Sequence, residues 1–183
     1  MYFETILNIA KAIKSKALTP VEITEAMLAR INEIDSYSSA YITVTTEHAL
    51  AQAKKSEAEI VAGQWRGLLN GVPIGLKDII NTDFAKTTAG TEIHRNYHPT
   101  YSATVVERLE TQGAISLGKL TTTEQAFSDH HPSVTVPRNP RGEGSPAAAL
   151  PRVSVWRPQM VWLSVLWGRT QVVRFVRPTV LPA

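Results

Sequence analysis

The 183-residue chain contains no cysteine, which excludes disulfides, thiolate nucleophiles and cysteine metal sites. It also lacks the glycine spacing of a phosphate loop or a dinucleotide fingerprint, and we expect no cofactor. No apolar run approaches the ~20 residues of a membrane-spanning helix. The opening "MYFETILNIAKAIKSK" places an acid and several lysines where a secretory signal would be apolar. We therefore expect a cytoplasmic chain with no membrane partner.

Acidic residues are missing from the end of the chain. From Gly144 to Ala183 there is no Asp, Glu, Lys, Asn, His, Tyr or Ile, yet this tail holds five Arg and three of the four Trp. Residues 1–143 carry a net charge of −2, so the overall charge of +3 comes from the tail alone. The tail shows no helical or alternating register that would gather its Arg on one face, and we expect no nucleic-acid partner.

Residues 1–143 read as one α/β domain with a core, since helical and strand patterns alternate along them. A first helix starts near Ile6, and a second begins with Thr19 as N-cap, Pro20 at the first helical position and Glu22 completing a capping box. The remaining expected elements are a strand in 39–44, a helix in 46–63 ended by Gly63, a glycine-broken strand in 68–80, and a helix, turn and buried strand in 102–120. From Pro140 the periodicity disappears, and we expect residues 144–183 to form an irregular tail.

One lysine, Lys77, lies in the apolar segment "GVPIGLKDII". Burial disfavours an ammonium ion, and lowering a lysine pKa by about 3, which corresponds to about 4 kcal/mol, yields a base usable near neutral pH. The alternative is that Lys77 extends its charged end to the surface and pairs with Asp78. The pattern alone leaves both interpretations open.

Other polar clusters indicate less chemistry. The adjacent His130 and His131, and the pair His94 and His98, lack the carboxylate ligands of a metal site, and we expect no metal. The hydroxyls of Thr121 to Thr123 are interpreted as caps of a following helix.

Four motifs occur in a fixed order: "GVPIGLKD", "TTAGT", "SATVVERLETQGAISLGK" and "PRNP". In order and spacing they resemble the amidase signature family, and the resemblance covers most of residues 1–140. It implies that Lys77 stands at the position of the family's catalytic lysine. It also implies an α/β fold, the N-terminal portion of the amidase signature fold with a mixed sheet flanked by helices, which is incomplete because the family is roughly twice this length or more.

The resemblance implies hydrolysis of a carboxamide by a Ser, cis-Ser, Lys triad. A neutral lysine takes a proton through a bridging serine, a second serine attacks the amide carbon, and backbone N–H groups of a Gly-Ser loop hold the oxyanion. Both serines belong to a Gly-Ser-rich block that should follow "PRNP", where this sequence has "RGEGSPAAALPRVSVW". Substrate-binding residues do not follow from the sequence.

The tail becomes intelligible when its codons are read one frame away. Starting at the third base of each codon, Ala147 onward is compatible with Gly-Gly-Ser-Ser-Ser-Gly, and "VLWGRTQVVRFV" is compatible with Ala-Leu-Gly-Thr-Asp-Thr-Gly-Gly-Ser-Val-Arg. Some positions are forced, since Trp167 followed by Gly168 must read Gly. This predicts a shift of the reading frame between about Pro140 and Ala147, and an out-of-frame tail. Past Val176 the shifted frame fits the family less well.

We therefore expect an amidase-family fragment that lacks both serines and is inactive, whose parent enzyme takes a small-molecule amide. A second hypothesis is a non-catalytic binding remnant. A third is a fragment of the ammonia-supplying component of a tRNA-dependent amidotransferase, its A chain, although "SDHHPSV" looks less like that branch. The missing strands would leave an unpaired sheet edge that allows self-association.

Overall fold

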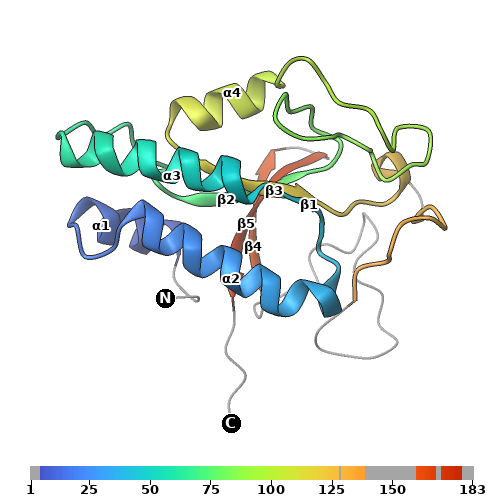
Figure 1. Ribbon diagram of the computed structural model, residues 1–183, viewed down its shortest axis with the longest axis horizontal. Helices are drawn as coiled ribbons and strands as arrows, with labels where there is room; N and C mark the ends of the chain where they lie inside the picture. The colour runs from blue at the N-terminus through green and yellow to red at the C-terminus, as the bar shows by residue number, and fades with distance from the viewer. Residues whose placement is uncertain (1–4, 128, 139–159, 168–169, 179–183) are drawn as a thin grey trace, which may run out of the picture.

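The computed structural model describes residues 5–127, 129–138, 160–167 and 170–178, and shows a mixed sheet flanked by helices (Figure 1). In chain order the elements are α1 (Ile6–Lys14), α2 (Pro20–Ser38), β1 (Tyr41–Val44), α3 (Thr46–Val61), β2 (Pro73–Lys77), α4 (Thr104–Thr111), β3 (Ile115–Leu120), the 3₁₀ turn η1 (Glu124–Ala126), β4 (Met160–Trp167) and β5 (Thr170–Pro178). Every helix and strand expected in residues 1–120 is present. The α/β class is confirmed.

The start of α2 follows the predicted capping box. The Thr19 side chain accepts a hydrogen bond from the backbone N–H of Glu22 at 3.1 Å, and the Glu22 carboxylate accepts from the backbone N–H of Thr19 at 2.8 Å. Pro20 opens the helix, where its missing N–H would have had no helical partner. These contacts fix where the longest helix begins.

The five strands run in the order β1-β3-β2-β5-β4. Strands β2 and β3 are parallel and are joined through α4, whereas the other neighbours pair antiparallel. A bulge in β3 falls at Gly118, whose φ of +148° suits glycine, and a Cβ there would lie 2.2 Å from the backbone oxygen of Thr43. Glycine at this position therefore allows β1 and β3 to approach each other.

Two apolar clusters hold the sheet between its helices. One joins α2 and α3 to β3, and its buried members include Ile31, Ala49 and Leu117. The other joins α4 to β2 through Val106, Ile74 and Leu76. Both faces of the central strands are thereby covered, and every residue of β2 and β3 is buried. A side chain on these strands is either part of the core or directed into a site at the strand ends.

The expected irregular tail differs from the structure over two segments. Strands β4 and β5 form a hairpin, and β5 pairs antiparallel with β2 through residues 173–175. The segments are rich in Val, Leu and Trp, which favour strands whatever their period. The expected unpaired edge of β2 is therefore occupied, and the remainder of residues 139–183 lies outside the described part of the chain.

None of the described helices is long and apolar enough to cross a membrane.

Candidate active site

Lys77 is the last residue of β2, at the edge of the sheet where the parallel strands β2 and β3 both end. Its side chain lies among the buried residues, with 8% of its surface exposed. In register it stands beside Leu120, the last residue of β3. Of the two interpretations that the sequence left open for this lysine, the structure shows the buried one.

Asp78 is the residue that the alternative interpretation paired with Lys77 at the surface. In the structure its carboxylate contacts Thr88 and Lys119. Its carboxylate accepts hydrogen bonds from the backbone N–H of Thr88 at 3.0 Å and from the Thr88 hydroxyl at 2.5 Å. Its other oxygen lies 3.3 Å from the Nζ atom of Lys119. Both charged side chains of this ion pair are fully buried. Asp78 is thus committed to Lys119 and Thr88.

Lys119 is a functional candidate that sequence reasoning missed. It sits in β3, and its Nζ donates to the Thr87 hydroxyl at 2.6 Å and to the backbone oxygen of Lys86 at 3.2 Å. The signal that could have found it is a lysine inside "AISLGKL", an otherwise apolar run that reads as a buried strand. A buried lysine there requires acceptors and a counter-ion, and Asp78 is the acid that follows the neighbouring strand.

Burial sets the protonation of this pair. It raises the pKa of Asp78, against the lowering effect of the Thr88 hydroxyl and of the Lys119 charge. It lowers the pKa of Lys119, against the raising effect of the Asp78 charge and hydrogen bond. Asp78 is therefore the group that favours the charged form of Lys119, whereas the charged form of Asp78 is favoured first by the Thr88 hydroxyl and then by Lys119.

The segment between β2 and α4 is folded over the strand ends through the "TTAGT" motif. The backbone N–H of Ala89 donates to the backbone oxygen of Asp78, and that of Gln125 donates to the backbone oxygen of Ala89, at 3.0 and 2.7 Å. Between them, Gly90 has a φ of +64°, and a Cβ at this position would lie 2.7 Å from the backbone oxygen of Thr122. Through Ala89 the motif therefore connects Asp78, the residue after β2, with the chain that follows β3.

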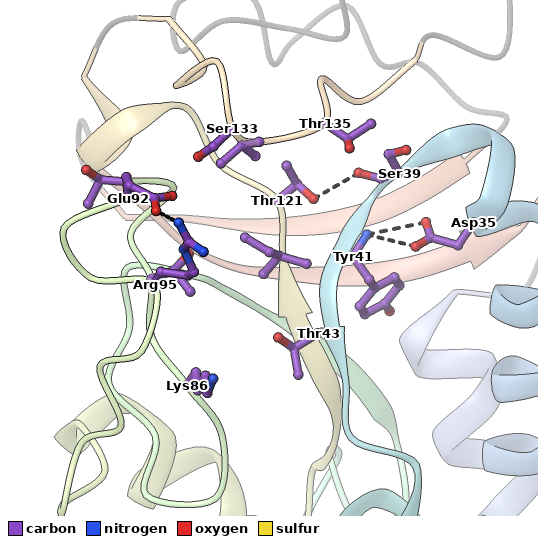
Figure 2. Close-up of a pocket in the computed structure, with 14 residues that line it drawn as sticks. Asp35, Ser39, Tyr41, Thr43, Lys86, Glu92, Arg95, Thr121, Ser133 and Thr135 are labelled. Carbon is purple, nitrogen blue, oxygen red and sulfur yellow. Dashed lines mark hydrogen bonds and ion pairs between the residues drawn. The ribbon is translucent and has the colours of Figure 1, made fainter.

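A cavity of about 610 Å³ opens beside this motif, between β1, the segment that follows β2 and residues 133–135 (Figure 2). Most of its lining residues are of polar type, and they include Asp35, Lys86, Thr88 and Arg95. Lys77 is not among its lining residues, so the cavity and the candidate catalytic lysine are separate features of the described structure. Thr88 connects them, because it lines the cavity and also binds Asp78.

Two of the candidate histidines have local partners. His131 Nδ1 lies 2.8 Å from the Ser133 hydroxyl, and His98 Nδ1 lies 3.2 Å from the backbone oxygen of Pro99. Within the described residues no group of three or more His, Cys, Asp or Glu could hold a metal ion. The capping interpretation of the threonines is wrong for Thr123, which precedes the short η1 without a side-chain cap bond. The hydroxyl of Thr121 instead donates to the backbone oxygen of Ser39, which ties β3 to the end of α2.

Comparison with known proteins identifies the family, since the model of the family "Amidase" matches residues 22–145. The chain belongs to the amidase family. It is 44% identical over 135 residues to AmiD of Mycobacterium tuberculosis, a protein that bears the name of an amidase; the match covers 74% of this chain and 28% of AmiD. It is also 44% identical over 129 residues to the A chain of the glutamyl-tRNA(Gln) amidotransferase of a Geobacter species, which covers 70% and 26% of the two chains.

Solved amidase-family structures share the fold. The native peptide amidase of Stenotrophomonas maltophilia superposes with a TM-score of 0.65 at 32% identity, over 69% of this chain and 26% of the peptide amidase. This chain therefore spans little more than a quarter of the length of these relatives.

Proposed function

We propose that this chain is the N-terminal part of an amidase that hydrolyses the C–N bond of a small carboxamide, and that Lys77 is the base of its catalytic triad. The supporting observation is a buried lysine at the end of a central strand, in a chain that belongs to the amidase family. A lysine in this position loses hydration of its ammonium form, which favours the neutral amine that a base requires.

In the parent enzyme, Lys77 takes a proton from a bridging serine as that serine takes one from the nucleophilic serine. The nucleophile attacks the amide carbon, the C–N bond breaks, and the protonated amine or ammonia leaves an acyl-enzyme ester. Water then hydrolyses the ester to the carboxylate. Residues 1–143 supply only the lysine of this scheme, because the family's Gly-Ser block is not present in the sequence of this chain.

We further propose that residues 144–183 are translated out of frame and that the 183-residue chain is inactive. The family match ends at residue 145, and the composition changes at residue 144. In the shifted frame the codon of the nucleophile straddles Val173 and Arg174, so neither residue can act in its place. Without a nucleophile, covalent catalysis has no first step.

Ammonia release from a panel of simple carboxamides tests two proposals, namely amide hydrolysis by the parent enzyme and the inactivity of the 183-residue chain. The purified 183-residue chain should release none above buffer. The same gene with one base added or two removed between codons 140 and 147, chosen to restore Gly-Gly-Ser-Ser and Asp-Thr-Gly-Gly-Ser, should show turnover. Turnover by the 183-residue chain would overturn the proposed inactivity. An inactive restored enzyme, shown to be folded, would overturn the proposed stand-alone hydrolysis of small carboxamides.

The similarity to the A chain of an amidotransferase supports a second candidate, a fragment of an enzyme that supplies ammonia to a partner. The restored protein separates the two. A stand-alone amidase releases ammonia from small amides without partners, whereas an amidotransferase component should depend on its partner chains and on charged tRNA. A binding remnant would remain inactive in either setting and would bind a partner through residues 1–143.

A further inference from the structure

The sheet has two outer strands, β1 and β4, and they differ in length. Among the described strands, β1 pairs with β3 alone and β4 pairs with β5 alone. An outer strand directs about half of its backbone N–H and C=O groups away from the sheet, where they can pair with another chain. β1 has four residues and β4 has eight, so β4 offers the longer ladder.

The two outer strands also differ in regularity. At the start of β1, two steps along the strand correspond to one step along β3, so the extra residue lies on β1. In the hairpin, the two steps from Ser164 to Leu166 on β4 correspond to three steps on β5, from Arg174 to Gln171, so the extra residue lies on β5. A bulged outer strand bends, which hinders pairing with a new strand. The bulges therefore protect the β1 edge and leave β4 regular.

The sequence of β4, "MVWLSVLW", has none of the residues that commonly protect a sheet edge. It contains no charged side chain, no Pro and no Gly, whereas natural edge strands often carry Lys or Pro. Val and Trp, which favour strands, make up four of its eight residues. An uncharged segment of this composition pairs readily with another strand.

A second copy of this chain fits the β4 edge in length and in charge. The β4 strand of a second copy offers eight residues, whereas a β1 strand would offer four and a bulge. Two β4 strands bring no charges opposite each other, although the tail that contains them holds five Arg. Two of these, Arg174 and Arg177, belong to β5, which lies on the inner side of β4.

We propose that β4 pairs antiparallel with β4 of a second copy, about a two-fold axis perpendicular to the sheet, and that the 183-residue chain is a dimer. Five strands from each copy then form one sheet of ten, a size that open sheets reach. Both copies use the same surface, so the assembly closes at two copies. This surface is not the β2 edge that the sequence predicted for self-association, because β5 occupies that edge. The proposal is independent of the proposed amide hydrolysis.

The first test measures the mass of the 183-residue chain by sedimentation, and we expect twice 20.1 kDa. A two-fold axis through the middle of β4 places Leu163 opposite residue 163 or 165 of the second copy. Leu163→Lys and Leu163→Glu should each give a monomer, because like charges then lie close together. An equimolar mixture of the two variants should recover the dimer. Val61→Lys, at an exposed position on α3, is the control and should remain a dimer.

The second test uses the absence of cysteine from the chain. Ser164→Cys introduces a single thiol near the middle of β4, and a short bismaleimide should link two copies through it. Ser15→Cys, exposed at the end of α1, is the matched control and should give little linked product at the same protein concentration. Adding Leu163→Lys to Ser164→Cys should abolish the link.

Four results would overturn the proposal: a monomeric mass for the unchanged chain at its highest soluble concentration, a distribution of species larger than a dimer, dimers that persist in both Leu163 variants, and a mixture of these variants that stays monomeric. Circular dichroism shows whether the Leu163 variants fold. If they do not, the cysteine variants decide, and equal linking through Ser164→Cys and Ser15→Cys overturns the proposal.

Discussion

Strands β2 and β5 lie side by side in the sheet, although they come from parts of the chain with different composition. Strand β2 ends at a buried lysine and belongs to the matched family region, residues 22–145. Strand β5 belongs to the tail, which has no acid and five Arg. Pairing with a sheet edge needs only a β-prone run, because the ladder is made by the backbone. A site needs particular side chains at particular places, and residues 5–138 show these whereas the tail sequence does not.

The largest expected effect is the loss of catalytic rate when Lys77 is removed from the frame-restored enzyme. In the frame-restored enzyme, Lys77→Ala should lower kcat by about 10²–10⁴-fold, the usual contribution of a positioned general base. Lys55→Ala is the matched control and should retain activity, because Lys55 is exposed on α3 and does not line the cavity. Ammonia release under substrate saturation gives the comparison. Equal rates for the two variants would show that the base is another residue.

The sequence predicted the elements of residues 1–120 because local signals there agree with one another. The capping box at Thr19, the glycine after α3 and the helix–turn–strand unit around Gly113 each name an element without help from the rest of the fold. For Lys77 the aliphatic flanking residues left burial and a surface pair with Asp78 both open, and the structure shows burial. Local signals were sufficient wherever a feature depends on neighbours in the chain.

The sequence did not predict the partner of Asp78. Asp78 and Lys119 are 41 positions apart, and their contact arises only when β2 and β3 pair in parallel. From sequence alone, the expected alternative partner of Asp78 was its neighbour Lys77. In the structure, the parallel pairing of β2 and β3 brings Lys119 to Asp78 instead. The β4–β5 hairpin was missed for the opposite reason, because it depends on apolar content and on an available edge rather than on a period.

The next effect is on stability. Asp78→Ala removes the counter-ion of a fully buried ammonium and should lower the free energy of unfolding by about 3–5 kcal/mol. Asp83→Ala is the control, since Asp83 is exposed and its bond to Ser102 is a surface contact; we expect a loss below about 1 kcal/mol. Urea denaturation followed by circular dichroism measures both. Similar losses for the two variants would mean that the buried pair is not formed in solution.

A smaller effect is expected where the backbone of β3 approaches β1. Gly118→Ala should destabilise the fold by about 1–3 kcal/mol, because the new Cβ meets the backbone oxygen of Thr43 at 2.2 Å. Gly63→Ala separates this clash from conformational strain, since Gly63 also has a positive φ, of +80°, but no atom lies within 4 Å of its Cβ position. The same denaturation assay should rank Gly118→Ala as the more damaging change. The reverse order would contradict the bulged pairing of β1 and β3.

The smallest expected effect tests how much the N-terminal capping bonds of α1 and α2 contribute to the free energy of unfolding. Thr19→Ala removes one of the two reciprocal bonds of the capping box and should cost about 1 kcal/mol. Thr5→Ala removes a single cap bond of 3.2 Å at the start of α1 and should cost less, because α1 is shorter and buries only two residues. The first loss should persist in a chain that ends at residue 143, since the buried side chains of α2 pack on β3. Disappearance of the Thr19 effect on removal of the tail would show that the two parts of the chain fold as one unit.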